Sequence, residues 1–391
     1  MKDVFIVSAV RTPVGKQKGA LRNYMAPELL GLVLDEALRR IDLDPDMIDD
    51  VIGGTVYQLG EQGFTLARMG VLASKLLPQT IPGISVNRQC GSGLSAIQLG
   101  HAMIASGNMD TVIAAGCEVM SKYTIMSDLN GELYNKEPMG NPFGPYYTGK
   151  YGPANQMVSA QKIAHKWGVT KEECFQFAIN SHQKAQKATD AGYFRKEILP
   201  VKGLDKDDNE ILQENDETIR PQTNAKILES LKVLPGTDWL TVGLSSTITD
   251  GASAMILMSE EKLKSLGLAP MARVVANTVV GSDPELMLTG PIYATPKLLE
   301  KAGLDPKEID IYEINEAFAP IPLAWAKATD TDLEKLNVNG GALALGHPVG
   351  NTGCRLSVSA IHELHRRDAR YALVSLCTGG GMAPATIFER V

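Results

Sequence analysis

The chain has 391 residues, of which 44% are hydrophobic and 21% are charged, and its net charge is -7. This length allows a large core and two or three domains, and the composition excludes a disordered or collagen-like protein. The acidic balance argues against a nucleic-acid surface, because no basic excess is available to neutralise phosphates.

Short β-branched runs alternate with helix-periodic stretches from the start of the chain. We expect strands over residues 4–7, 51–56 and 111–115 and helices over residues 27–40 and 93–104. This alternation is typical of an α/β fold with a largely parallel sheet that is covered on both faces.

The cysteines and the first residues indicate the compartment. Five cysteines are scattered without C-x-x-C spacing, which disfavours a disulfide framework and a zinc site. The opening MKDVFIVSAVRT enters a strand pattern without a cationic leader or a long apolar segment. We therefore expect a cytoplasmic protein with no membrane span and no bound metal.

The last third of the chain echoes the first. Residues 43–52, LDPDMIDDVI, resemble residues 304–313, LDPKEIDIYE, at an offset of 261 (305 minus 44). The strand-like run that begins at Thr111 resembles one that begins at Ala372, again 261 residues later (372 minus 111). These echoes predict two similar α/β halves, with chance similarity of short apolar runs as the alternative.

The segment between the halves differs from them in amino-acid composition. It carries the Tyr/Pro/Gly-rich stretch NPFGPYYTGKYG and the charged stretch KGLDKDDNE, both typical of loops. We therefore expect an N-terminal half over 1–118, an inserted loop domain over 119–250 that returns to that half at its end, and a C-terminal half over 251–391.

A cysteine lies at one predicted strand-to-helix joint. Residues 86–98 read VNRQCGSGLSAIQ and place Cys90 just before the helix. Such a joint lies at the carboxyl edge of a sheet, and the positive end of the helix dipole favours a thiolate. We expect the thiol to be largely ionised at neutral pH, although buried cysteines are more often inert.

A histidine occupies an unusual glycine-rich stretch, NGGALALGHPVGNTG, over residues 339–353. His347 has glycines on both sides, which packing alone explains poorly, although most histidines are surface or satisfied core residues. The internal repeat places His347 in the loop equivalent to that of Cys90.

Two further motifs accompany them. In LCTGGG, Cys377 ends a predicted strand before three glycines whose amides can form an anion-binding nest, or simply a tight turn. In NEAFA, over residues 315–319, Asn315 could cap a helix or orient a water.

Together these motifs supply a nucleophile, a base, a second thiol and two clusters of backbone donors. A cysteine hydrolase needs one thiol and one histidine. A second acid/base is needed when a C–H proton must also be moved. The set therefore indicates carbon–carbon bond formation or cleavage beside a thioester.

NRQCGSG, NEAFA, GGALALGHPVG and CTGGG, in this order and spacing, resemble the four active-site motifs of the thiolases. The resemblance covers essentially the whole chain and implies the thiolase fold, with two α/β halves in a layered αβαβα core and an inserted loop domain. It implies that Cys90 is acylated and that His347 activates it. It further implies that Asn315 holds a water, that Cys377 moves the α-carbon proton, and that the amides of Cys90 and Gly379 form an oxyanion hole.

The resemblance also implies the ligands. Coenzyme A and acyl-CoA are the expected substrates, no metal or redox cofactor is needed, and a homodimer or homotetramer is expected. Candidate coenzyme A contacts are Arg220 in TIRPQT, Ser246 in TVGLSSTITDGA and Phe318 in the pantetheine tunnel.

The chain departs from the usual thiolase pattern at a few positions, namely Val242 to Leu244, Tyr293 and Asn351. None of these removes a catalytic group, but they bear on the shape of the coenzyme A and acyl pocket. An inactive coenzyme A-binding thiolase relative and a cysteine-dependent thioesterase are the alternatives. Ketoacyl and hydroxymethylglutaryl-CoA synthases are disfavoured by the pair of Asn315 and Cys377.

Two further patterns are weaker candidates for a functional role. HELH, over residues 362–365, spaces two histidines for a metal but is better interpreted as a solvated helix face. Tyr146, Tyr147 and Tyr151 could line a substrate pocket or pack on their own domain.

Overall fold

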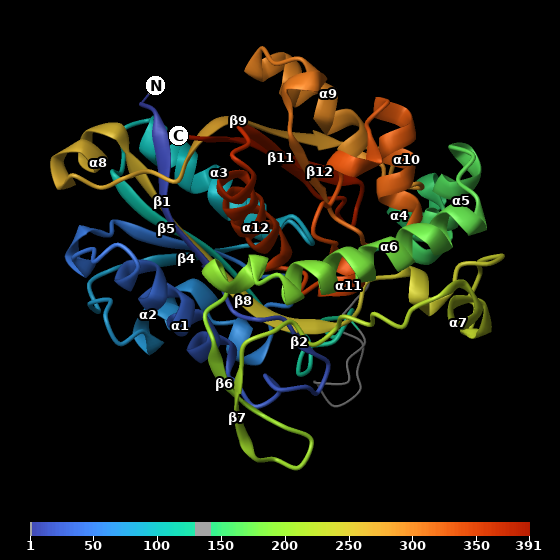
Figure 1. Cartoon of the computed structure of the whole chain (residues 1–391), viewed down its shortest axis with the longest axis horizontal. Coiled ribbons are helices and arrows are strands. Elements are labelled where there is room, and N and C mark those ends of the chain that lie inside the picture. The colour runs from blue at the N-terminus through green and yellow to red at the C-terminus, as the bar shows by residue number, and fades with distance from the viewer. Residues whose placement is uncertain (1, 130–141) are drawn as a thin grey trace.

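The computed structural model describes residues 2–129 and 142–391. Its main sheet has the strand order β10-β11-β12-β9-β1-β8-β5-β3-β4, and β2 pairs with β8 (Figure 1). The strands are β1 Val4–Arg11, β2 Gly15–Lys16, β3 Asp50–Gly54, β4 Gly83–Val86, β5 Thr111–Val119, β8 Thr249–Ser259, β9 Ala272–Gly281, β10 Ile311–Ile314, β11 Tyr371–Ser375 and β12 Met382–Arg390. A separate hairpin joins β6 Val201–Leu204 and β7 Glu210–Gln213.

The helices cover both faces of this sheet and build the inserted segment. They are α1 Ala26–Arg39, α2 Leu66–Ala73, α3 Ser92–Ala105, α4 Pro145–Tyr151, α5 Gln156–Lys166, α6 Lys171–Asp190, α7 Ala225–Ser230, α8 Glu260–Leu266, α9 Gly290–Ala302, α10 Pro320–Thr329, α11 Ala342–Leu345 and α12 Thr352–Arg367. No helix in the described part of the chain is long and apolar enough to cross a membrane.

The expected pair of similar halves is confirmed by the pairing of the strands. In the first half β3 is parallel to β5, which is antiparallel to β8, and in the second β10 is parallel to β11, which is antiparallel to β12. The halves meet where β1 pairs with β9. The echoed LDP segments form the same structure, a 3-10 turn capped by Asp44 or Asp305 ahead of β3 or β10.

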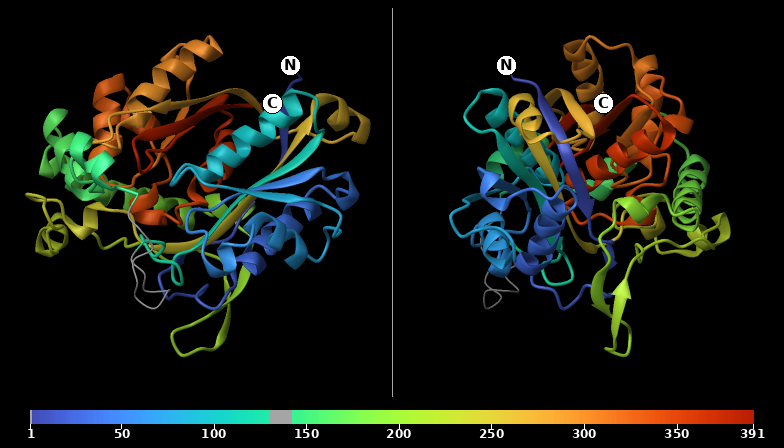
Figure 2. Two further views of the ribbon diagram at one scale, coloured as in Figure 1. Left: turned by 180° about the vertical axis from the view of Figure 1, so that it is seen from behind. Right: turned by 60° about the vertical axis from the view of Figure 1, so that its left-hand side comes forward.

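The elements stack in the expected five layers (Figures 1 and 2). α1 packs on the outer face of the first half, and α9 and α10 pack on the outer face of the second. Between the two half-sheets lie α3 and α12, which pack against each other and share one apolar core. The two buried helices therefore belong to one central layer, and their N-termini come together.

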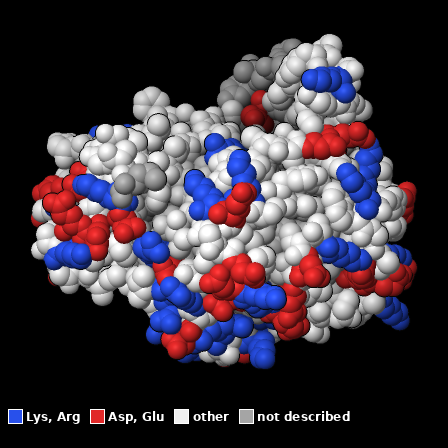
Figure 3. All heavy atoms as spheres, turned by 90° about the horizontal axis from the view of Figure 1, so that it is seen from above, with Lys and Arg blue, Asp and Glu red and all other residues white. Residues whose placement is uncertain are grey.

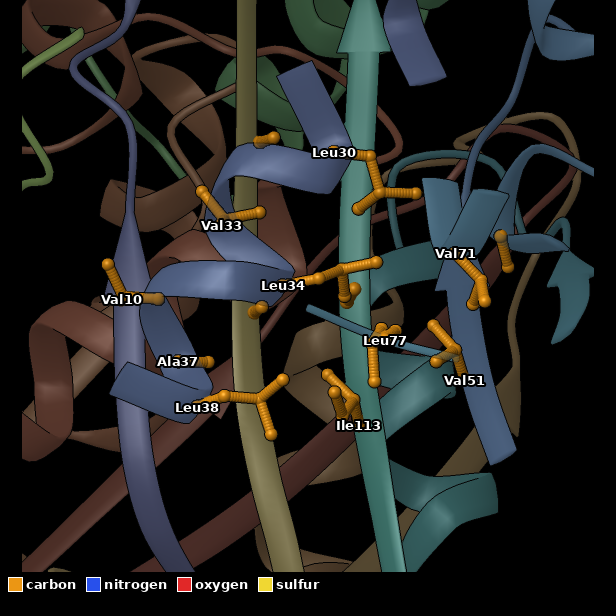
Figure 4. Packing of buried hydrophobic residues seen from close by; sticks show 14 of the residues in the cluster. Val10, Leu30, Val33, Leu34, Ala37, Leu38, Val51, Val71, Leu77 and Ile113 are labelled. Atoms are coloured by element: carbon orange, nitrogen blue, oxygen red, sulfur yellow. The ribbon is translucent and has the colours of Figure 1, made fainter. Parts of the chain in front are cut away.

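Helix α1 illustrates how the sequence builds an outer layer. Its leucines at positions 29, 30, 34 and 38 recur at helical spacing and are buried (Figure 4). Pro27 fits the first turn, and Glu28 accepts a hydrogen bond from the Met25 amide at 3.1 Å. The apolar face of α1 therefore packs onto β5 and β8.

The prediction of a largely parallel sheet is wrong, because the sheet is mixed. β8 and β9 run antiparallel to β1, and β12 runs antiparallel to β9 and β11. Every residue of β5 and β8 is buried, and strands covered on both faces show the same continuous apolar run whether they are parallel or antiparallel. In this sheet β8 lies between β1 and β5 of the first half.

Two glycines allow the central helices to approach closely. A Cβ on Gly93, near the start of α3, would lie 2.7 Å from the Cys354 amide nitrogen of α12. A Cβ on Gly353, in the equivalent place on α12, would collide with the Leu94 amide of α3. Any larger residue at either position would separate the N-termini of the two helices.

The inserted segment is fixed to the first half by a buried arginine. Arg11, at the end of β1, donates from Nε to Glu197 at 2.6 Å and from both terminal nitrogens to Asp216 at 2.7 and 3.0 Å. All three side chains are at most 2% exposed. Asp216 also accepts from the Val14 amide, so one cluster joins β1 to two parts of the insertion.

We expect Arg11→Met to destabilise the fold by about 3–5 kcal/mol, because it leaves two carboxylates buried without their cation. Urea unfolding monitored by circular dichroism measures this loss. The matched control is Lys202→Met, which removes an ion pair at 3.5 Å on the exposed hairpin and should leave stability unchanged. Equal stability of the two variants would contradict the structural role of Arg11.

Candidate active site

Cys90 lies immediately before α3, as the sequence predicts. Gln89 has a φ of 49°, and the turn is fixed by Ser92, whose hydroxyl donates to the Gln89 carbonyl at 2.6 Å and accepts from the Arg88 amide at 2.9 Å. A Cβ on Gly91 would lie 2.9 Å from Cγ2 of Thr378. The turn that carries Cys90 is therefore in contact with the loop that carries Cys377.

The Cys90 thiol is 9% exposed and is faced by two backbone amides, its own and that of Gly379. Burial raises the pKa of the thiol to about 11, and the two amides offset this only in part. The expectation of a thiol largely ionised at neutral pH is therefore wrong, because desolvation outweighs the donors at the helix N-terminus. Cys90 needs a base when it reacts.

His347 is held in one tautomer by its neighbours. Its Nδ1 lies 2.7 Å from the Thr352 hydroxyl, which donates its own proton to the Pro348 carbonyl at 2.9 Å. Since that hydroxyl can only accept from the imidazole, Nδ1 carries the proton and Nε2 carries the lone pair. Burial, together with the Arg355 charge, lowers the pKa of His347 to about 3, so the ring is neutral.

Asn315 lies beside this lone pair. Its Nδ2 is 3.4 Å from His347 Nε2, which fixes the orientation of the amide, since Nε2 accepts. Its Oδ1 is buried and has no partner among the described residues. The alternative role as a helix cap is wrong, because α10 begins at Pro320 with Ala319 before it.

Cys377 follows β11 and is fully buried. Burial, with a contribution from the neighbouring Cys90, raises the pKa of the Cys377 thiol, so the two sulfur atoms lie within electrostatic range and both are protonated. Gly380 and Gly381 have φ values of 83° and 78°, which residues with side chains rarely adopt. These glycines turn the loop so that Gly379 faces Cys90.

One buried carboxylate that we did not predict holds the site together. Glu118, at the end of β5, accepts from Gln62 at 2.6 Å and from the amides of Val56 at 2.8 Å, Tyr57 at 3.2 Å and Gly350 at 2.9 Å. It thereby joins the loop after β3 to the loop that carries His347. A lone Glu at the end of an apolar strand carries no signal of this role in the sequence.

The candidate coenzyme A residues separate into two places. Ser246 and Phe318 lie together, because the Ser246 amide donates to the Ala317 carbonyl at 3.0 Å and Ser245 bridges to Phe318. Arg220 is exposed elsewhere on the insertion, and its amide donates to His182 Nδ1 of α6 at 3.1 Å. The described contacts therefore bring two of the three candidates together.

The positions that depart from the usual pattern also differ in their surroundings. Val242 and Tyr293 are 48% and 44% exposed, whereas Leu244 is fully buried. Asn351 is buried at the start of α12, and its Oδ1 has no partner among the described residues. Asn351 therefore lies in the interior, and the two exposed side chains lie on the surface.

The weaker patterns have structural explanations. His362 and His365 bond separate backbone carbonyls, those of Ala9 at 3.0 Å and Met271 at 2.8 Å. The prediction that both histidines lie on a solvated helix face is thus only partly correct, because His362 packs on β1. No group of three or more potential metal ligands occurs in the described residues. The rings of Tyr147 and Tyr151 on α4 pack in a tilted arrangement with their centroids 5.3 Å apart.

Two related α/β halves with two buried thiols and a neutral imidazole at their junction define an acyltransferase of the thiolase class. Two family profiles cover nearly the whole chain: "Thiolase, N-terminal domain" matches residues 4–261 and "Thiolase, C-terminal domain" matches residues 268–390. The chain belongs to the thiolase family.

Individual relatives agree with this assignment. The chain is 41% identical to a 3-ketoacyl-CoA thiolase of Bacillus subtilis, with both chains fully covered. It is 40% identical to a steroid 3-ketoacyl-CoA thiolase of Mycobacterium tuberculosis, covering all of this chain and 95% of the relative. The acetyl-CoA acetyltransferase of Bacillus anthracis superposes with a TM-score of 0.90 at 36% identity, covering all of this chain and 99% of the other.

Proposed function

We propose that the chain cleaves 3-oxoacyl-CoA with coenzyme A to give acetyl-CoA and a shortened acyl-CoA, and that it also catalyses the reverse reaction, as in β-oxidation. The observation that carries this proposal is the pair of buried, protonated thiols of Cys90 and Cys377, together with the neutral ring of His347 on the loop whose Val349 packs with Cys90. One thiol and a base suffice for acyl transfer, and the second supplies the acid/base that a C–H bond requires.

In the first half-reaction, His347 Nε2 takes the Cys90 proton as the sulfur bonds to the 3-oxo carbon. The oxygen of that carbon becomes an oxyanion, and the amides of Cys90 and Gly379 stabilise it. The C2–C3 bond then breaks, and its electron pair forms the enolate of acetyl-CoA. Cys377 gives its proton to C2, which releases acetyl-CoA and leaves an acyl group on Cys90.

The enolate oxygen requires its own donors. In the proposed mechanism they are His347 and a water held by Asn315. Support comes from the buried Oδ1 of Asn315, since an unpartnered buried oxygen is a suitable acceptor for one proton of a bound water. The other proton of that water can then point to the enolate.

In the second half-reaction, the thiol of coenzyme A attacks the acyl-Cys90 carbonyl. The Cys377 thiolate takes the proton of that thiol, the tetrahedral intermediate collapses, and Cys90 leaves with the proton held by His347. These steps need no metal or redox cofactor, because a thioester already acidifies its α-carbon. Ser246 and Phe318 are proposed to contact pantetheine, and Arg220 the nucleotide of coenzyme A.

A second copy of the chain is the proposed protein partner, as a homodimer or homotetramer. β4 ends the sheet, with the side chain of Ile84 50% exposed, and Leu99 of the neighbouring α3 is 44% exposed. An unpaired apolar edge strand favours pairing with another chain. Lysine and arginine are interspersed with acidic residues on the face in Figure 3, in keeping with partners other than nucleic acid.

All five cysteines are unpaired and buried. This supports the cytoplasm as the proposed compartment, because thiols remain reduced there.

The proposal is tested by incubating the enzyme with coenzyme A and 3-oxoacyl-CoA substrates of short, medium, long and branched chains. We expect loss of the 3-oxoacyl thioester with one acetyl-CoA formed for each substrate consumed. Free acid without any need for coenzyme A would indicate a thioesterase instead. Coenzyme A binding without turnover of any substrate would indicate an inactive relative.

We expect Thr352→Val to lower kcat about 10–100-fold, because the valine no longer accepts the Nδ1 proton and the imidazole loses its fixed tautomer. Thr352→Ser keeps the hydroxyl and should restore most of the activity. Equal losses in the two variants would contradict the role of the hydroxyl and indicate a packing effect.

The pKa of about 3 for His347 also predicts a pH profile. The base must be neutral, and a lowered pKa keeps it neutral on the acidic side, so kcat/KM for the 3-oxoacyl-CoA should not fall near the ordinary histidine pKa of about 6.5. A loss of activity near that pH in the wild type, abolished in a His347 variant, would show that His347 has an ordinary pKa.

A further inference from the structure

A small hydrophobic cluster encloses one side of the Cys90 thiol. We call it the Cys90 cluster, and it consists of Val56, Tyr57, Met120, Tyr123 and Val349 packed with Cys90 itself. Tyr57 is 7% exposed and Tyr123 is 9% exposed, so both rings lie in the interior.

The other sides of the thiol are occupied by groups that react or stabilise charge. The Gly379 amide faces the sulfur, Cys377 lies within electrostatic range of it, and His347 is two residues before Val349 of the cluster. The Cys90 cluster is the apolar surface that packs directly against the Cys90 side chain, so the substituent of a carbonyl carbon bonded to this sulfur would contact it.

The cluster is held in a fixed shape. The backbone of Tyr57 donates to Glu118 at 3.2 Å and accepts from the Gln62 side chain at 2.8 Å. The phenol oxygen is faced by the Met126 amide. A wall fixed at both its backbone and its ring is preorganised to discriminate acyl groups by size.

The charges around the cluster are negative. Glu118 and Asp128 both act on the Tyr57 phenol, and Glu118 also acts on Cys90. The Arg88 side chain donates to the neutral Ser95 hydroxyl at 2.8 Å and Lys122 pairs with Glu61 at 3.0 Å, and among the described residues neither cation donates to a member of the cluster.

An acyl chain that ends in a carboxylate would lose its hydration in the cluster and meet like charge. Burial of an uncompensated carboxylate is costly, and nearby carboxylates add repulsion in an interior of low dielectric constant. An uncharged acyl group meets neither cost and gains contact with the apolar side chains.

We propose that the Cys90 cluster is the acyl pocket, that it selects uncharged acyl groups over acyl groups with a terminal carboxylate, and that Tyr57 limits their size. This inference rests on the proposed thiolase reaction and names the class of its substrate. The relatives do not settle this choice of substrate. One of them, a "Beta-ketoadipyl-CoA thiolase" of Escherichia coli that is 38% identical with both chains fully covered, is named for an acyl group with a terminal carboxylate.

The test compares 3-oxohexanoyl-CoA with 3-oxoadipyl-CoA, which have acyl chains of equal length and differ in the terminal carboxylate. We expect kcat/KM of the wild-type enzyme to be at least about 100-fold higher for 3-oxohexanoyl-CoA. Similar values, or a preference for 3-oxoadipyl-CoA, would overturn the acyl pocket while leaving the proposed reaction intact. Cleavage of neither substrate, nor of any other 3-oxoacyl-CoA, would overturn both.

A variant tests the residue itself. Tyr57→Ala should raise the ratio of kcat/KM for 3-oxodecanoyl-CoA to that for acetoacetyl-CoA about 10-fold or more, because the ring no longer limits the acyl chain. The control is Tyr24→Phe. It removes a phenol hydroxyl that donates to the Lys202 carbonyl, outside the Cys90 cluster, and it should leave the ratio of the two kcat/KM values unchanged. An unchanged ratio in a Tyr57→Ala enzyme that melts like the wild type would overturn the assignment of Tyr57.

Discussion

Replacement of Cys90 by alanine is expected to lower kcat/KM for thiolysis of 3-oxoacyl-CoA by about 10⁴-fold or more, because the covalent route is removed. The residual rate would come from the oxyanion donors and from substrate binding, which the variant retains. Mass spectrometry after incubation with acetyl-CoA should show an acylated wild-type protein and no acylated Cys90→Ala protein.

The chain offers a matched control for this variant. Cys174, in α6, is also fully buried and packs in the apolar core between the insertion and the second half, but it has no role in the proposed proton transfers, so Cys174→Ala should retain both thiolysis and acylation. Thiolysis by Cys90→Ala at a rate close to that of the wild type would rule out the proposed nucleophile. An acyl group found on another cysteine of the wild type would assign the role elsewhere.

Replacement of Cys377 by alanine should separate the two kinds of proton transfer. We expect thiolysis of 3-oxoacyl-CoA to fall about 10³-fold, because no acid remains to protonate C2 of the leaving enolate. Acylation of Cys90 by acetyl-CoA should be slowed much less, because in that step Cys377 only protonates the coenzyme A thiolate, which is a good leaving group, and no C–H bond is broken. Rapid-quench mass spectrometry of the acyl-enzyme, beside steady-state thiolysis, measures both steps.

The contrast between the two variants is the decisive result. Loss of acylation in Cys377→Ala without any change in α-proton exchange would mean that Cys377 serves acyl transfer instead of the C–H proton transfer. Exchange of the α-protons of acetyl-CoA with deuterium from solvent gives an independent measure. It should be slow in Cys377→Ala and unaffected in Cys174→Ala.

The sequence by itself determined which groups are proposed to react. Cys90, His347 and Cys377 each lie within two residues of a glycine, which is visible in the sequence without coordinates, and small residues are needed where backbone and substrate approach closely. The two similar halves were predictable as well, since the LDP turn that precedes β3 occurs a second time before β10. These features are local, and local sequence encodes them.

The ionisation of the thiol and the strand directions were decided only by the tertiary structure. Helix position alone favoured a thiolate at Cys90, but burial reverses this and raises its pKa to about 11. Burial depends on how α3 and α12 pack between the sheets. The strand directions depend on partners more than 100 residues apart, such as β1 and β8.

The support of the site was likewise invisible in the sequence. Glu118 joins two loops through amides of residues 56, 57 and 350, and Thr352 fixes the tautomer of His347 through a hydroxyl whose own proton is used elsewhere. A residue type in a sequence shows which chemistry is possible. The partners around a residue are set only when distant segments fold against one another. Those partners then decide which proton the residue holds and how much water stays around it.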